Sequence, residues 1–402
     1  MSQRANAIAV VCFTAFLLLS ACSGLSVPRE SASSAGAETA AATPPTDLSD
    51  EIVKAADAEY LLLTKIYARS SPSVVNIEAT NGDERRRGSG FVYDRQGHII
   101  TNAHLVKDAD SIVVTLRNTF VLDADLLGLD SFSDLAVLKI STGEERLSPL
   151  RIGESATVKV GQRAISIGNP FGLKASMTTG IVSGLGRTLP SAELIDAGLA
   201  AGFDNPSIIQ IDAAIHPGNS GGPLLDSAGL VIGITTAMQS DSGQFQGIGF
   251  AVPADTMRRV IPDLIADGRV EYAWMGISVM PEDGGYGVAG LSEALDLPVE
   301  RGVLLRGVSE GSPAHLAGLR GGDTLVDVRG KRVCVGGDLI VAINGVYFDD
   351  LDALITYLVQ NTHPGDEVEL VVIRNRQAVD ISLKLQRRPE GDRPTIDCDT
   401  TP

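Results

Sequence analysis

The segment Gly218–Leu224 reads GNSGGPL and places a serine between glycines, with a proline three residues after it. A serine hydroxyl is a poor nucleophile unless a neighbouring base takes its proton. In one kind of serine site the serine begins a helix, and its acid and histidine partners follow it in the chain. In another kind the partners come before the serine, in the order His, Asp, Ser.

The residues after Ser220 favour the second kind of site. The histidines that follow it are His315 and His363 alone. Pro223 stands where the first helical turn would form, and residues 222–238 (GPLLDSAGLVIGITTAM) consist of two apolar stretches around a DSAG turn. We therefore predict strand, turn, strand after Ser220, and we expect its partners to precede it.

His104 and Asp134 are the candidate partners, in the segments HIITNAHLV and SFSDLAVLKI. An imidazole titrates near neutral pH, so His104 suits the role of base. Asp134 would fix the tautomer of the ring and stabilise the imidazolium. Glycines beside Ser220 would let the backbone turn so that the amides of Gly218 and Ser220 point at a developing oxyanion.

Other candidates have simpler interpretations. His98 beside a strand is typical of a hydrogen-bonded structural histidine, and Asp130 before a strand is typical of a turn residue. Asp212 is the alternative to Asp134 as the acid.

Six segments resemble, in order, the motifs of the HtrA/Deg family of serine endopeptidases. They are GSGFVYDRQGHIITNAHLV, SDLAVLKI, AISIGNPFGL, TTGIVSGLGR, DAAIHPGNSGGPLLD and GIGFAVP, and the resemblance extends from about Ser71 to Leu385. It implies an all-β chymotrypsin-like double β-barrel followed by an α+β PDZ domain, with the triad between the barrels. It assigns the role of the acid to the Asp of SDLAVLKI, which is Asp134, rather than to Asp212. It also implies an ATP-independent enzyme without a cofactor. His216 departs from the family, which usually has Asn there.

The primary specificity pocket is predicted to be apolar. In chymotrypsin-type enzymes its floor is the residue six positions before the nucleophile, which here is Ala214. Cleavage after Lys or Arg would need a buried carboxylate there. Ala214 and Ile215 offer none, and Phe250, which the resemblance places near the pocket wall, adds no charge. We expect cleavage after Val, Ala, Ile or Leu.

A length of 402 residues allows two or three domains. About a dozen short apolar runs separated by turn residues predict an all-β domain over 71–268, ending in a helix after Pro253 that Gly268 closes. The resemblance then implies a PDZ domain over 272–388, followed by a polar tail at 389–402.

The PDZ domain is expected to bind peptide C-termini. Its carboxylate loop would be the segment Trp274, Met275, Gly276 and Ile277, and the peptide would add as a strand beside GISVM, facing a helix at 349–361. The alternative is that Trp274 and Met275 are simply core residues. GGDTLVDVRG at 321 and GGDLIVAING at 336 repeat at an offset of 15, and we predict two turns that each feed a strand of one extended hairpin.

The first 22 residues resemble the signal peptide of a bacterial lipoprotein. An early arginine precedes an apolar run of about 15 residues, which is shorter than the roughly 20 that a spanning helix needs. The run ends in LSAC, so Cys22 would be acylated and would anchor the protein on the outer face of a membrane; the alternative is an ordinary signal peptide. A flexible linker is expected over 23–46. A lead-in helix follows over 47–70, a region that forms trimers in the family.

Composition excludes some partners. A formal charge of −17 argues against nucleic acid binding, which needs clustered Lys and Arg. No residue spacing predicts a metal site. Cys334 and Cys398 could pair in an exported protein, or Cys334 could be an unpaired core residue.

The sequence is consistent with two candidate functions. The first is a lipid-anchored endopeptidase that degrades misfolded exported proteins. The second is a peptide-binding chaperone or regulatory sensor whose proteolysis is minor or tightly gated.

Overall fold

The computed structural model describes residues 50–116, 119–169, 175–189, 205–216, 218–238, 247–279, 286–389 and 398. The expected signal peptide with Cys22, the linker over 23–46 and most of the polar tail lie outside these residues.

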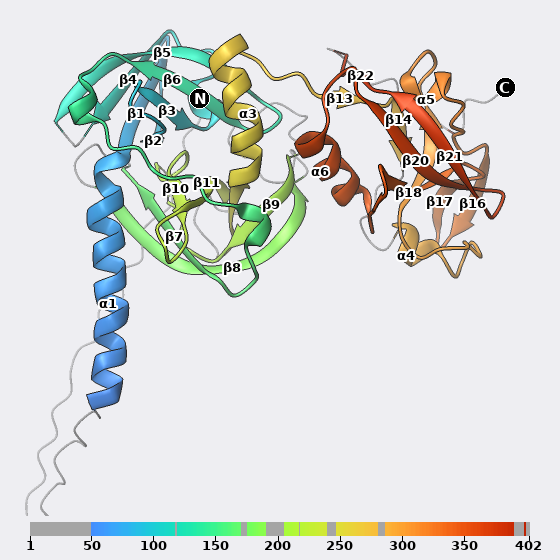
Figure 1. The fold of residues 1–402 in the computed structure, drawn as a ribbon, viewed down its shortest axis with the longest axis horizontal. Coiled ribbons are helices and arrows are strands. Elements are labelled where there is room, and N and C mark those ends of the chain that lie inside the picture. Colours follow the sequence, from blue (N-terminus) through green and yellow to red (C-terminus); the bar gives the residue numbers. More distant parts are fainter. Residues whose placement is uncertain are drawn as a thin grey trace, which may run out of the picture. The chain divides into compact units, whose positions relative to one another are not determined.

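Twelve strands of the described chain form two closed antiparallel barrels of six strands (Figure 1). The order in the first barrel is β1-β2-β3-β6-β5-β4, and in the second it is β10-β11-β12-β9-β8-β7. The first barrel contains β1 (Val74–Asn81), β2 (Glu84–Val92), β3 (His98–Thr101), β4 (Ser111–Leu116), β5 (Phe120–Asp130) and β6 (Leu135–Ile140). The second contains β7 (Arg163–Gly168), β8 (Ser176–Leu189), β9 (Asn205–Ile211), β10 (Pro223–Leu225), β11 (Val231–Met238) and β12 (Gly249–Pro253). The strands predicted after Ser220 are therefore β10 and β11.

The two barrels share one apolar core. Phe91 and Val137 of the first barrel pack in the same buried cluster as Ile165 and Ile234 of the second. Helix α3 (Ala254–Asp267) closes this cluster with side chains spaced three and four residues apart, as expected for an amphipathic helix. Groups on facing sides of the barrels are consequently held in fixed positions.

Helix α3 begins and ends where the sequence predicts. Pro253 has extended backbone just before it, and Gly268 follows it with a φ of 72°, the left-handed conformation that ends many helices. The helix lies beside the barrels (Figure 1).

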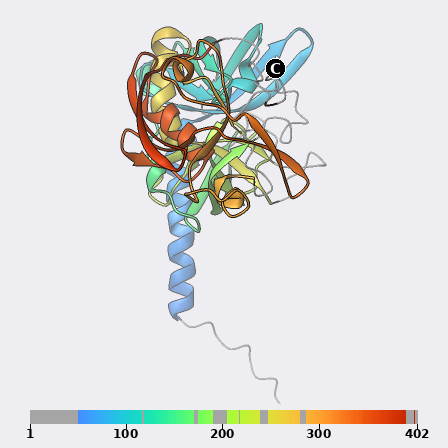
Figure 2. The ribbon, with the colours of Figure 1, turned by 90° about the vertical axis from the view of Figure 1, so that its right-hand side faces the viewer.

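Helix α1 (Asp50–Ser70) precedes the first barrel and is exposed along most of its length (Figure 2). Its last turns contact the protease domain, because Ile66 is buried, Tyr67 Oη donates to the carbonyl of Ala175 at 2.6 Å and Arg69 donates to that of Ala228 at 2.6 Å. Pro72 lies in the 3₁₀ turn (Ser71–Ser73) that follows the helix. Among the described residues, no helix combines the length and the apolar character needed to cross a membrane.

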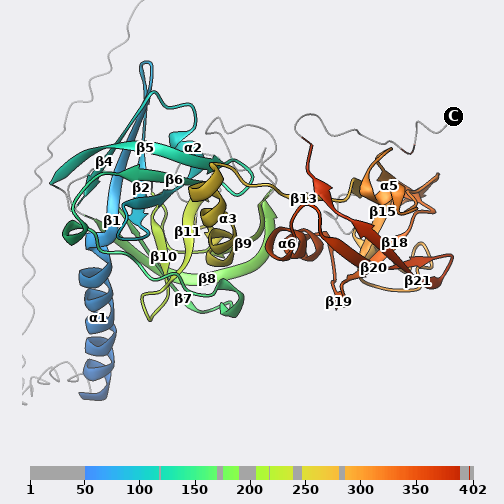
Figure 3. The ribbon, with the colours of Figure 1, turned by 45° about the horizontal axis from the view of Figure 1, so that its top comes forward.

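The second domain is a sheet in the order β14-β15-β18-β20-β21, with β19 beside β18. These strands are β14 (Ile277–Val279), β15 (Val303–Val308), β18 (Leu339–Ile343), β19 (Val346–Tyr347), β20 (Glu367–Arg374) and β21 (Gln377–Lys384). Short strands β13 (Ala273–Trp274) and β22 (Gln386–Arg387) pair with each other. The helices are α4 (Val288–Leu291), α5 (Pro313–Leu316) and α6 (Leu351–Asn361), and α6 lies beside the sheet (Figure 3).

The two Gly-Gly-Asp repeats each feed a strand, but the prediction of one extended hairpin is wrong. The first repeat forms β16 (Thr324–Val328), which pairs with β17 (Lys331–Val335) in a separate two-stranded sheet, whereas the second forms β18 in the main sheet. The two aspartates also differ in their surroundings. Asp338 is buried and accepts bonds from Arg374 at 2.7 and 2.6 Å, while Asp323 is exposed and accepts only a bond from Thr324 among the side-chain bonds of the described residues.

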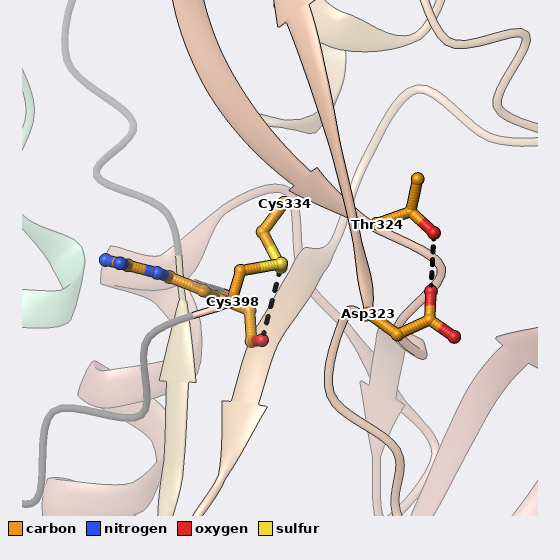
Figure 4. The surroundings of a disulfide bond; sticks show 5 residues. Asp323, Thr324, Cys334 and Cys398 are labelled. Carbon is orange, nitrogen blue, oxygen red and sulfur yellow. Dashed lines mark hydrogen bonds between the residues drawn. A yellow bond between two sulfur atoms is a disulfide. The ribbon is translucent and has the colours of Figure 1, made fainter. Parts of the chain in front are cut away.

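A disulfide joins Cys334 of β17 to Cys398, 64 residues further along the chain (Figure 4). Cys334 is buried, and its sulfur lies beneath Gly322, where an added Cβ would approach the sulfur to 2.5 Å. Of the two alternatives for these cysteines, the structure contains the paired one. Such a bond persists in oxidising compartments.

Candidate active site

His104 and Asp134 lie together on the first barrel. His104 is in the short helix α2 (Ala103–Val106) after β3, and Asp134 is in the turn before β6. The ring Nδ1 is 2.8 Å from Asp134 Oδ2 and 3.0 Å from Oδ1. The backbone is fixed as well, because His104 N donates to Asp134 Oδ1 at 3.0 Å and Ala103 N donates to the Asp134 carbonyl at 3.1 Å. This geometry places the neutral ring's proton on Nδ1 and leaves the lone pair of Nε2 available to accept a proton.

A residue that the sequence did not reveal completes the surroundings of the carboxylate. Thr236 of β11 is buried, and its hydroxyl donates to Asp134 Oδ2. Asp134 is only 3% exposed, so nearly all its hydrogen bonds must come from protein groups. The second barrel therefore helps to hold an acid that belongs to the first.

The turn that carries Asp134 is held by Asp130. Asp134 has a φ of 55°, an unusual value for a residue other than glycine. Asp130 Oδ2 accepts bonds from Ser133 N at 2.9 Å and Ser133 Oγ at 2.5 Å, and it also accepts the hydroxyl of Tyr272. Burial, and next the charge of Asp130, raise the pKa of Tyr272 well above 10, so the phenol stays protonated as a donor. The sequence predicts a turn residue at Asp130; it is the last residue of β5, and its carboxylate holds the turn that follows.

The other sequence candidates lie elsewhere. His98 Nδ1 is 2.6 Å from Asp94 Oδ2, in keeping with a structural histidine. Asp212, the alternative acid, is exposed and accepts a bond from Ile181 N at 2.6 Å. Among the described residues, no hydrogen bond or ion pair joins Asp212 to His104.

Ser220 lies in the loop between β9 and β10, and both barrels hold this loop. Its carbonyl accepts a bond from Ser89 N of β2 at 2.8 Å, and Gly221 N donates to the Thr235 carbonyl of β11 at 2.8 Å. Gly221 has a φ of 85°, and an added Cβ would come within 2.1 Å of Ser89 O, so only glycine fits. Among the described residues, no hydrogen bond joins Ser220 Oγ to His104. Such bonds are often long without substrate and shorten when it binds.

The Ser220 amide points away from Thr235 and Gly222. The carbonyl of Asn219 accepts bonds from Thr235 Oγ1 at 2.8 Å and from Gly222 N at 3.0 Å. In a trans peptide the N–H points opposite to the carbonyl, so the Ser220 N–H faces the other way. Gly218 has a φ of 93°. The preceding Pro217 lies outside the described residues.

The predicted pocket residues differ in exposure. Ala214 is partly exposed, and its carbonyl accepts a bond from Thr178 Oγ1 at 2.8 Å. Ile215 and Phe250 are buried, each in an apolar cluster of the protease domain. None of the three carries a charge that could hold a Lys or Arg side chain.

The predicted carboxylate loop lies at an unpaired sheet edge. β14 pairs only with β15 among the described strands, so its other edge is free. The carbonyls of Met275 and Gly276 accept bonds from Ala314 N at 2.9 Å and Ser309 N at 2.8 Å. The amides of Gly276 and Ile277 belong to the same two peptide planes and therefore point the opposite way. Met275 is buried and Trp274 half-buried, so the side chains of the loop also serve the core.

Comparison with known proteins agrees with this architecture. Residues 88–234 match the trypsin-like peptidase domain and residues 273–385 the PDZ domain. Protease Do-like 1, chloroplastic, of Arabidopsis thaliana is 37% identical over 350 residues, which cover 84% of this chain and 74% of that protein. A probable periplasmic serine endoprotease DegP-like of Chlamydia trachomatis is 39% identical over 306 residues, 76% of this chain and 55% of that protein. The chain thus spans about half the length of the chlamydial relative.

Solved structures agree as well. The HtrA-type protease AlgW with tripeptide superposes with a TM-score of 0.65 at 34% identity, over 82% of this chain and 98% of that one. The serine endoprotease from Yersinia pestis gives a TM-score of 0.55 at 27% identity, over 81% and 98%.

Two six-stranded barrels followed by a PDZ domain define a trypsin-like serine endopeptidase that carries a peptide-binding module. The chain belongs to the HtrA family of serine endoproteases.

Proposed function

We propose that His104, Asp134 and Ser220 are the catalytic triad of an ATP-independent endopeptidase that degrades misfolded exported proteins. The observation that carries the proposal is the contact of His104 Nδ1 with the buried Asp134, 2.8 Å from Oδ2, in a protease whose Ser220 loop is held by both barrels. Ser220 Oγ attacks the scissile carbonyl while His104 Nε2 takes its proton and later gives it to the leaving amine. The amides of Gly218 and Ser220 stabilise the oxyanion, and water then hydrolyses the acyl-enzyme.

The substrate class follows from two properties. The relatives from Chlamydia trachomatis and Hahella chejuensis are named periplasmic, and the disulfide of this chain suits an exported protein. We therefore propose misfolded proteins of the cell envelope as substrates.

The pocket should select aliphatic residues. Ala214, Ile215 and Phe250 supply apolar surface without a carboxylate, and each methylene of fit discriminates by only about 1–3 kcal/mol. Digestion of reduced casein, followed by mass spectrometry of the products, should show most cuts after Val, Ala, Ile or Leu. The same preparation carrying Ser220→Ala is the control for contaminating proteases. A majority of cuts after Lys or Arg would show that the pocket residues are misassigned.

The PDZ domain should bind peptides through an apolar C-terminal residue. The free edge of β14 can accept a strand, and the amides of Gly276 and Ile277 can bind a carboxylate. Calorimetric titration should give binding of a peptide ending in Val or Leu, with a loss of at least about tenfold in affinity when its terminus is amidated. A peptide ending in Asp is the control for the side-chain preference. Equal affinity for the free and amidated forms would refute carboxylate recognition at this loop.

A second candidate is a regulatory sensor whose proteolysis is tightly gated. It is supported by the presence of a PDZ domain in the same chain as the peptidase domain, because a peptide bound to the first could act on the second. Casein digestion separates the two candidates. A general degrading enzyme cleaves casein without any PDZ ligand, whereas a gated sensor cleaves it only when the C-terminal peptide is added.

We also propose a lipid anchor at Cys22 and a location on the extracytoplasmic face of the cell envelope. The LSAC segment supports the anchor.

A homotrimer is proposed as well, because the exposed face of α1 carries the large side chains of Tyr60 and Leu61. Sedimentation velocity gives the mass in solution, and a monomer at micromolar concentration would exclude the trimer.

A further inference from the structure

Ser89 of β2 connects the first barrel to the nucleophile loop. Its side chain is fully buried. Its hydroxyl accepts a bond from Asn169 N at 2.7 Å and lies 2.5 Å from the carbonyl oxygen of Gly218, to which it donates. Its backbone N donates to the Ser220 carbonyl at 2.8 Å. A single residue therefore binds the carbonyls of Gly218 and Ser220.

The direction of the hydroxyl proton is fixed. Asn169 N has only a proton to offer and the Gly218 carbonyl has only lone pairs, so the Ser89 hydroxyl must accept from the first and donate to the second. Ser89 itself is held in place, because Thr101 Oγ1 donates to its carbonyl at 2.7 Å. The Ser89 hydroxyl that binds Gly218 is therefore fixed in its orientation.

The hydrogen bond from Ser89 Oγ to the Gly218 carbonyl fixes the orientation of the Gly218–Asn219 peptide. One side of the peptide, the Gly218 carbonyl, is bound by Ser89 Oγ, and the other, Asn219 N, donates to the His216 carbonyl at 2.9 Å. Gly218 has a φ of 93° and no side chain to resist rotation. The hydroxyl of Ser89 is accordingly the group from the facing barrel that keeps this peptide from turning over.

We propose that Ser89 is a positioning residue for the oxyanion hole. By binding the Gly218 carbonyl, it holds the Gly218–Ser220 backbone in the conformation in which the amides of Gly218 and Ser220 meet the oxygen of the scissile carbonyl. The inference rests on the proposed function, in which these amides stabilise the oxyanion. It concerns the transition state rather than substrate binding, because the negative charge develops only as Ser220 attacks.

The test compares Ser89→Ala with Ser166→Ala in the full chain. Ser166 of β7 is a matched control, since it is also a fully buried serine and its hydroxyl has no hydrogen-bond partner among the described residues. Loss of a whole oxyanion donor lowers kcat by about 10²–10³-fold, so loss of a group that positions one should lower kcat by about 10–100-fold. We expect KM within about twofold of wild type for Ser89→Ala, and kcat and KM both unchanged for Ser166→Ala.

A second readout separates positioning from a merely structural role. A peptide aldehyde forms a hemiacetal with Ser220, whose oxygen occupies the oxyanion hole, whereas the corresponding peptide alcohol only occupies the substrate groove. Ser89→Ala should lose affinity for the aldehyde by about the factor lost in kcat, with the alcohol bound as in wild type. Ser89→Thr, which keeps the hydroxyl, is the second variant and should recover aldehyde affinity relative to Ser89→Ala.

Three outcomes would overturn the inference. The first is an unchanged kcat in Ser89→Ala, and the second is an equal loss of affinity for the aldehyde and the alcohol. The third is a fall in kcat that is fully accounted for by the fraction of Ser89→Ala that is unfolded, as measured by its melting temperature. Failure of the proposed function is recognised separately, because then Ser220→Ala would itself retain cleavage.

Discussion

Replacing Ser220 by alanine should lower kcat by about 10⁶-fold, and His104→Ala should cost about as much. Ser220→Ala lacks the attacking oxygen, and His104→Ala lacks the base that takes the proton from it. Because the two residues act as one unit, the double variant should be no slower than either single variant. The folded state of Ser220→Ala should survive, because among the described residues the Ser220 hydroxyl makes no hydrogen bond that its loss would break, whereas His104→Ala also removes the ring contact with the buried Asp134. Initial rates on a fluorogenic peptide, with circular dichroism as the control for folding, measure the effect.

Asp134→Asn belongs to the same experiment and should be milder, with a loss of about 10⁴-fold in kcat. An amide beside His104 Nδ1 favours the wrong tautomer, so Nε2 would carry the proton and could not act as base. The loss should shrink as pH rises if hydroxide replaces the base. Activity near wild type in any of the three variants would remove that residue from the proposed triad.

Cys22→Ala should move the protein from the membrane fraction to the soluble fraction. Stable attachment needs two acyl chains, each methylene contributing about 0.8 kcal/mol, so removing the acylated cysteine removes nearly all membrane affinity. Metabolic labelling with palmitate and fractionation of the cells measure the effect together. Cys12→Ala, in the apolar run of the same segment, is the matched control and should keep both label and membrane attachment. Equal labelling of wild type and Cys22→Ala would refute the lipid anchor.

The sequence predicts the fold well where a local residue dictates the backbone. Pro223 prevents a helix after Ser220, and a strand begins there. Pro253 and Gly268 bound α3 as expected. Asp350 caps α6 by accepting a bond from Ala353 N at 2.9 Å. In each case the decisive group lies within a few residues of the element.

The sequence does not predict contacts between residues that lie far apart in the chain. Thr236 and Asp134 are 102 residues apart, and Ser89 and Gly218 are 129 residues apart. These pairs meet only because the two barrels pack on each other, and a buried Ser or Thr within a strand carries no local sign of such a role. The repeat at 321 and 336 likewise does not predict which sheet each strand joins, and the two copies have different distant contacts: Asp338 binds Arg374, 36 residues away, whereas Asp323 is exposed.

The most direct test of the central claim is labelling with a peptidyl phosphonate ending in valine, followed by identification of the modified residue by mass spectrometry. The reagent reacts with a serine only where a base activates the hydroxyl and amides receive the phosphonyl oxygen, so it reports on the whole site at once. The account predicts a single adduct on Ser220 in the wild-type protein, and none in Ser220→Ala or His104→Ala. An adduct on another residue, or labelling that persists in Ser220→Ala, would contradict it.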